Sequence, residues 1–126
     1  MKPIILAVDD SKAIRFLLQS IFGKKYQVVT AADASSAMYW LSRKELPQLI
    51  ITDAQLPDVE NWEFIANLKS SFLYQQIPSI VLSSLDAVET RSQCESYGID
   101  HFFSKPFNPV EIMDLVNDLM LKENIH

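Results

Sequence analysis

Acidic side chains follow two of the short apolar runs in this 126-residue chain. Asp9 and Asp10 stand side by side after the first run, and Asp53 follows the third. Adjacent carboxylates repel each other, and the repulsion disfavours ionisation of both. A cation among three such groups would relieve the repulsion, and hard oxygen ligands select a hard divalent ion such as Mg²⁺. The acids therefore predict a magnesium site wherever the fold brings them together.

A hydroxyl group and an ammonium group follow two further runs, as Ser83 and Lys105. A magnesium ion held by only two or three carboxylates keeps positions open for phosphate oxygens. Lysine is a point charge suited to a phosphoryl oxygen, and a carboxylate can itself be the nucleophile and form an aspartyl phosphate. The set indicates a phosphoryl-binding site, and spacing alone leaves the nucleophile open among the three aspartates.

Five short apolar runs alternate with longer segments of helical period. This alternation predicts an α/β domain of (βα)5 type, a doubly wound five-stranded parallel sheet with helices on both faces. The expected strands are 4–8, 27–31, 49–52, 79–83 and 100–104. In open sheets of this kind the functional crevice lies at the carboxyl ends of the strands. All the side chains named above are therefore expected at one edge.

Helical periodicity fills the segments between the runs. Ser11, Asp33 and Asn108 stand where a helix should begin, and each side chain can accept a hydrogen bond from the first turn. The fourth helix, expected over residues 86–97, has few apolar positions and should be the most loosely held. Gly98 is its expected stop.

Composition and charge exclude several classes of function. The chain has 11 Lys and Arg against 16 Asp and Glu, a net charge of −5 and no basic cluster, so direct nucleic-acid binding is not expected. No apolar run approaches the ~18 residues of a membrane span. The single cysteine, Cys94, excludes an internal disulfide and suits a reducing cytoplasm. We expect one cytoplasmic domain over residues 1–126, with an ordered core at about 3–122.

Four motifs, in this order, resemble the receiver domain of two-component response regulators. They are VDDS at 8–11, DAQLPDVENWE at 53–63, LSSLDA at 82–87 and DHFFSKPF at 100–107. The resemblance covers essentially the whole chain. It implies the flavodoxin-like strand order 2-1-3-4-5 found in the chemotaxis regulators of this family, and phosphorylation of an aspartate in the presence of Mg²⁺.

The resemblance also implies roles for single residues. Asp53 matches the phosphorylated aspartate. Asp10, Asp53 and the backbone carbonyl of Gln55 match the magnesium ligands, and Asp9 matches a residue that reaches the ion through water. Lys105 matches the lysine that pairs with a phosphoryl oxygen.

Two more positions resemble the conformational switch of the family. Ser83 matches the hydroxyl that moves to the phosphoryl group, and Phe102 matches the aromatic residue that then swings inward. The added charge would recruit the hydroxyl and bias a two-state surface. The Lys105–Pro106 bond resembles one that is cis in the family.

Two further positions beside the site, Asn61 and Leu85, bear on the shape of the loop and on the lifetime of the phosphorylated state. Asn61 stands where a glycine is usual, so asparagine is expected to take a backbone conformation that most residues avoid. Leu85 matches a position that, with Gln55, tunes self-dephosphorylation. It has no polar atom to orient an attacking water, so the phosphorylated state should live longer than with a polar residue there.

By this resemblance the protein is a signalling switch with slow self-dephosphorylation, rather than a turnover enzyme. Its donor would be a phosphohistidine of a sensor kinase or phosphotransfer protein. The output is open: either an unknown partner protein or an effector domain of a longer protein. The fourth helix, fifth strand and fifth helix form the expected output face, and a phosphorylation-dependent dimer through that face also stays open.

Two other classes of function predict sequence features that differ from those of this chain. A receiver-like binding module that is never phosphorylated would be expected to lack Asp10, Asp53 or Lys105, and all three are present. A magnesium-dependent phosphohydrolase with an aspartyl nucleophile, in the manner of haloacid dehalogenases, would place its two acids two residues apart after the first strand. Here they are adjacent.

Overall fold

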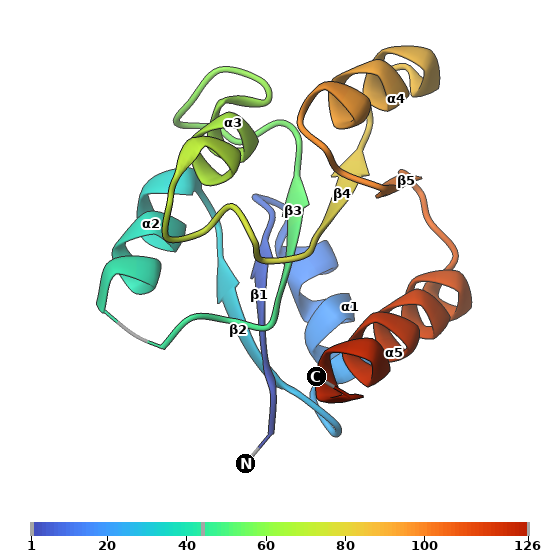
Figure 1. Cartoon of the computed structure of the whole chain (residues 1–126). Coiled ribbons are helices and arrows are strands. Elements are labelled where there is room, and N and C mark those ends of the chain that lie inside the picture. The colour runs from blue at the N-terminus through green and yellow to red at the C-terminus, as the bar shows by residue number, and fades with distance from the viewer. Residues whose placement is uncertain (1, 44, 126) are drawn as a thin grey trace.

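A computed structural model describes residues 2–43 and 45–125 of the chain. Five parallel strands form one sheet in the order β2-β1-β3-β4-β5 (Figure 1). The predicted strand order is therefore confirmed. The strands are β1 (Ile4–Val8), β2 (Gln27–Ala31), β3 (Leu49–Asp53), β4 (Ser79–Ser83) and β5 (His101–Ser104). Two bounds differ by one residue from the expected runs: β3 includes Asp53, and β5 begins at His101.

A helix follows each strand, and the helices cover both faces of the sheet as predicted (Figure 1). One core cluster lies between the sheet and the pair α1 and α5, and the other clusters lie beneath α2, α3 and α4. The helices are α1 (Lys12–Phe22), α2 (Ala34–Arg43), α3 (Glu63–Ser70), α4 (Ala87–Ser96) and α5 (Pro109–Ile125). Within the described residues, none of these helices is long and apolar enough to cross a membrane.

The central strands are apolar on both sides because both sides are covered. Successive side chains of a strand point to opposite faces, and in β1 Ile5 belongs to the core beneath α1 and α5 while Leu6 belongs to the core beneath α2 and α3. All five residues of β3 and of β4 are buried. Such strands give continuous apolar runs rather than alternating ones, which is why the runs could be found in the sequence.

The expected caps begin three of the helices. Ser11 accepts a hydrogen bond from the Ile14 N–H (3.3 Å), and Asn108 accepts one from the Val110 N–H (2.8 Å). Asp33 accepts one from the Ser36 N–H (2.7 Å). These contacts satisfy N–H groups that have no partner within the helix.

The fourth helix is held by few buried side chains, as predicted. Only Thr90 and Cys94 of α4 are buried, and Val88 is 76% exposed. Asp86 caps α4 by accepting two backbone N–H groups, and Gly98 follows the helix with a φ of +70°, a conformation that glycine adopts without strain. The local signals thus define where α4 begins and ends, while little apolar packing holds it to the sheet.

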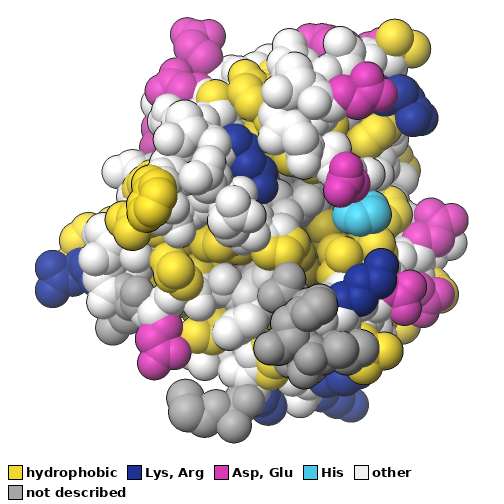
Figure 2. Space-filling model, viewed as in Figure 1, with side chains coloured by type: hydrophobic (Ala, Val, Ile, Leu, Met, Phe, Trp, Pro, Cys, Tyr) yellow, Lys and Arg dark blue, Asp and Glu magenta, His cyan; other side chains and the backbone are white. Residues whose placement is uncertain are grey.

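Figure 2 shows the molecule from the side seen in Figure 1. Hydrophobic side chains cross the middle of this face, and charged side chains of both signs are scattered around it. The basic side chains of this face form no single stripe.

Candidate functional site

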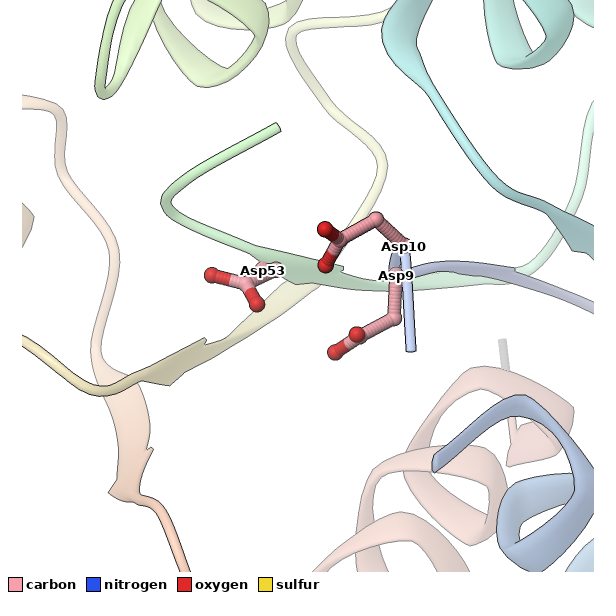
Figure 3. Close-up of side chains that lie close together, drawn as sticks. All are labelled: Asp9, Asp10 and Asp53. Atoms are coloured by element: carbon pink, nitrogen blue, oxygen red, sulfur yellow. The ribbon is translucent and has the colours of Figure 1, made fainter. Parts of the chain in front are cut away.

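Three aspartates meet at the carboxyl ends of β1 and β3. Asp9 and Asp10 follow β1 directly, Asp53 is the last residue of β3, and Val8 pairs with Thr52 in the register of the two strands. One carboxylate oxygen from each aspartate lies within 4.8 Å of the others (Figure 3). Asp9 and Asp53 are buried, and Asp10 is exposed. The predicted convergence is therefore present.

Lys105 crosses from the end of β5 into this cluster. Its Nζ lies 2.7 Å from Asp9 Oδ2 and 2.5 Å from Asp53 Oδ2. Its backbone N–H donates to the Ser83 carbonyl (2.8 Å), which ties the loop after β5 to the end of β4. The Lys105–Pro106 peptide bond is cis. One ammonium group thus bridges two of the three carboxylates and leaves the cluster with an excess of negative charge.

Burial and hydrogen bonding shift the pKa of Asp53 in opposite directions, and the same holds for the pKa of Lys105. Burial raises the pKa of Asp53 above its ordinary value, although hydrogen bonds from Lys105 and from the Gln55 N–H lower it in part. Burial alone would lower the pKa of Lys105, but its hydrogen bonds to Asp53 and Asp9 outweigh this and raise it. The lysine is therefore held in its charged form by the carboxylates that it contacts.

Asp9 accepts hydrogen bonds at both carboxylate oxygens and at its backbone carbonyl. Its Oδ1 accepts the Ser11 N–H (2.9 Å), its Oδ2 accepts Lys105, and its backbone carbonyl accepts the Arg15 guanidinium (2.7 Å). Arg15 is a contact that the sequence analysis missed, since an arginine on a half-exposed helical position gives no signal of its own. Both carboxylate oxygens of Asp9 are engaged within the protein, whereas Asp10 reaches solvent.

An open cleft of about 380 Å³ lies over the acids. Asp53 Oδ1 accepts the Gln55 N–H (2.8 Å), so the backbone turns at the cleft directly after β3. Asp9 is not among the lining residues. The cleft is lined by Asp10, Asp53, Gln55, Leu56, Pro57, Asn61, Ser84 and Lys105.

The two expected switch residues lie beside the cleft, and neither lines it. The Ser83 hydroxyl is completely buried, accepts the Leu85 N–H (3.0 Å) and lies 2.9 Å from the Thr90 hydroxyl. Phe102 is half-buried on β5, and the Arg91 guanidinium lies 5.5 Å from the centre of its ring. Both partners belong to α4, and neither was found from the sequence.

The prediction for Asn61 is wrong. The strained position is the next residue, Trp62, which has a φ of +70°. A bulky residue rarely adopts this conformation, whose cost is about 1–3 kcal/mol. Trp62 is 5% exposed, stacks on Tyr97 with ring centres 6.5 Å apart, and donates its backbone N–H to the Ala54 carbonyl (2.8 Å). Burial of the large ring offsets the strain, so the loop turns at tryptophan.

Comparison with known proteins agrees with this fold. The family model for the response regulator receiver domain matches residues 5–117. The chain therefore belongs to the family of response regulator receiver domains.

Individual relatives differ in length. The chain is 31% identical to response regulator Rre1 of Synechocystis over 94% of its own length and 52% of that protein, so it spans about half of Rre1. It is 29% identical to the two-component response regulator ORR3 of Oryza sativa, with 96% of this chain and 93% of that protein covered. Among solved structures, chemotaxis response regulator CheY4 of Vibrio cholerae superposes with a TM-score of 0.82 at 27% identity, covering 94% of this chain and 99% of that chain.

Proposed function

We propose that this receiver domain accepts a phosphoryl group on Asp53 from a phosphohistidine of a sensor kinase or phosphotransfer protein. The observation that carries the proposal is the meeting of Asp9, Asp10 and Asp53 with Lys105 at one edge of the sheet. Receiver domains pair with such donors. The free thiol of Cys94 suits a reducing compartment, and we place the reaction in the cytoplasm.

The donor set fits Mg²⁺. Its atoms are carboxylate oxygens within 4.8 Å of one another, and a hard divalent cation prefers such ligands. Asp10, Asp53 and the Gln55 carbonyl would hold the ion directly. Asp9 would act through water, because it is completely buried and does not line the cleft, whereas Asp10 and Asp53 do. When bound, the ion supplies positive charge that offsets the charge of the phosphoryl oxygens.

The transfer itself needs a nucleophile and a counter-charge. A carboxylate oxygen of Asp53 attacks phosphorus, a new O–P bond forms, and the P–N bond of the phosphohistidine breaks with its electron pair left on the imidazole nitrogen. Lys105 favours the ionised carboxylate before the reaction. Its ammonium group then passes from Asp53 to a phosphoryl oxygen, where it neutralises part of the new charge.

The switch would follow from the added charge. The Ser83 hydroxyl moves toward the phosphoryl group, and the ring of Phe102 turns into the space that the hydroxyl leaves. The output face is the surface of α4, β5 and α5, where a partner protein, an effector domain or a second copy of the receiver would bind. The small number of buried side chains on α4 supports this choice. The phosphorylated state would then end by slow hydrolysis of the aspartyl phosphate.

Labelling by acetyl phosphate tests the proposal. The wild-type protein should gain one phosphoryl group in the presence of Mg²⁺ and none in EDTA, and Asp53→Ala should abolish the label. Glu60→Gln is a matched control, because this acid is exposed in the same loop and lies outside the cluster, and it should be labelled normally. Labelling of Asp53→Ala at the wild-type rate would refute the assignment.

The alternatives predict other results. A binding module that is never phosphorylated would leave the wild-type protein unlabelled. A phosphohydrolase would release phosphate from a simple phosphate ester over many turnovers.

A further inference from the structure

We propose that Thr90 of α4 holds the Ser83 hydroxyl in its resting position, so that α4 itself opposes the switched state until this hydrogen bond breaks. The inference rests on the proposed function, because it takes Ser83 as the hydroxyl that moves to the phosphoryl group. Thr90 is then a positioning residue, which acts on the site only through Ser83.

The contacts of Ser83 show how it is held. A serine hydroxyl has one hydrogen to donate and two positions at which it can accept. The Leu85 N–H occupies one accepting position (3.0 Å), and the Thr90 hydroxyl lies at 2.9 Å, where either oxygen can be the donor. Both hydroxyl-bearing residues are 0% exposed, so water does not compete for the pair. Among the described residues Thr90 is the single side-chain partner of Ser83, and it draws the hydroxyl toward α4.

Movement of Ser83 would leave Thr90 unpaired. A buried hydroxyl without a partner is costly, so Thr90 must find another acceptor or α4 must move until it reaches water. A helical threonine can turn back to the carbonyl four residues earlier, here that of Asp86, which already accepts the Thr90 N–H (2.9 Å). Either outcome changes the contacts that hold α4. The Ser83–Thr90 bond therefore links the state of the cleft to the position of this helix.

The next residue of α4 acts on the second switch residue. The Arg91 guanidinium lies over the Phe102 ring at 5.5 Å from its centre, an attractive cation–π distance. Two consecutive residues of one helix thus contact the two side chains that are expected to move. Since Thr90 and Cys94 are the only buried side chains of α4, loss of the Thr90 contact removes a large share of what holds the helix.

Two substitutions of Thr90 distinguish the effect of its hydroxyl group from the effect of its side-chain shape. Valine keeps the shape and removes the hydroxyl, so Thr90→Val should weaken the resting state without leaving an unpaired group in the switched state. We expect it to bind beryllofluoride with Mg²⁺ about fivefold more tightly than wild type by isothermal titration calorimetry, equivalent to ~1 kcal/mol for one hydrogen bond. Thr90→Ser keeps the hydroxyl and should stay within about twofold of wild type.

A double-mutant cycle shows whether Thr90 acts through Ser83. In a Ser83→Ala background, Thr90→Val should no longer change the affinity for beryllofluoride. An equal gain in that background, or no gain in the wild-type background, overturns the inference. A measurement on the wild-type protein is independent of how the variants fold: beryllofluoride should speed amide exchange in residues 87–96, and unchanged exchange there also overturns it.

The two proposals fail in different ways. If the wild-type protein neither binds beryllofluoride nor is labelled by acetyl phosphate, the proposed function is wrong and the role of Thr90 falls with it. If the wild-type protein does both while Thr90→Val binds as wild type does, only the role of Thr90 is wrong.

Discussion

The carboxylate cluster should destabilise the protein when no metal is bound. Asp10 lies within 4.8 Å of carboxylate oxygens of Asp9 and Asp53, and it is the exposed member of the three. Lys105 contacts the other two acids. Removing the charge of Asp10 therefore removes repulsion while it leaves the ion pairs of Lys105 in place. We predict that Asp10→Asn is more stable than wild type in EDTA.

The size of the effect follows from distance and exposure. Two unit charges 4.8 Å apart repel by about 1 kcal/mol in water and by about 3–4 kcal/mol at the lower effective dielectric of a partly buried site. Because Asp10 is exposed, we use the smaller repulsion energy, about 1 kcal/mol, for its interaction with Asp9 and again for its interaction with Asp53. The attraction between Asp10 and the positive charge of Lys105 offsets roughly half of the summed repulsion. The expected gain is about 1 kcal/mol in the free energy of unfolding, or ~4 °C in melting temperature for a domain of this size.

Metal binding should reverse the order of stability. Mg²⁺ at a hundred times its dissociation constant stabilises a folded protein by about 2.7 kcal/mol, and Asp10→Asn should lose most of this because it removes a proposed ligand. Urea unfolding in EDTA and in saturating Mg²⁺ measures both effects. Asp118→Asn, an exposed acid on α5, is the control and should change stability by less than about 0.5 kcal/mol. A variant less stable than wild type in EDTA, or one stabilised by Mg²⁺ as strongly as wild type, would refute the reasoning.

Three further predictions concern residues around the site. The Asp58 carboxylate accepts the Ser35 and Ala34 N–H groups at the start of α2, and these hydrogen bonds lower its pKa. Asp58→Asn should therefore destabilise the protein at pH 7. The difference should shrink as the pH falls below about 4, because the carboxyl group of the unfolded chain then takes up a proton before that of the folded protein does. An equal difference at pH 7 and pH 3 in urea unfolding would contradict this. Burial raises the pKa of the Cys94 thiol to about 11. Iodoacetamide at pH 8 should therefore modify the folded protein far more slowly than the urea-unfolded chain. Equal rates of modification would contradict protection of the thiol by burial. Leu85→Glu should shorten the lifetime of the phosphorylated state, because a carboxylate can orient water, and an unchanged decay rate would exclude the role proposed for Leu85.

The arrangement of strands and the meeting of the acids could be predicted because both depend on local patterns. A strand buried on both faces is a continuous apolar run, and parallel strands bring their carboxyl ends to one edge. Asp10, Asp53 and Lys105 could therefore be placed near each other from their positions after such runs. The convergence holds in the structure, where Asp10 follows β1, Asp53 ends β3 and Lys105 lies in the loop after β5.

Backbone strain could not be placed correctly from residue type. Asn61 was the expected position, because it stands where the family usually has a glycine and asparagine tolerates a positive φ better than tryptophan does. The structure has Trp62 there, because burial of the indole beside Tyr97, Ile65 and Val81 outweighs a local preference of a few kcal/mol. Packing between α3 and α4 therefore determines the backbone conformation of the loop at Trp62. This packing depends on the relative positions of the two helices, which the sequence does not give.

The orientation of the Ser83 hydroxyl could not be predicted from the sequence either. The sequence places Ser83 at the end of a strand beside the acids, but a serine side chain can turn to the cleft or away from it, and the choice depends on which partner the neighbouring helix offers. That partner is Thr90, a residue seven positions later in a helix with little apolar pattern. A weakly packed helix with one buried hydroxyl can respond to a change at a single strand end, because few other contacts resist its movement. The scarcity of apolar residues from which the sequence predicted a loosely held α4 would also suit this helix to the role that we propose for it.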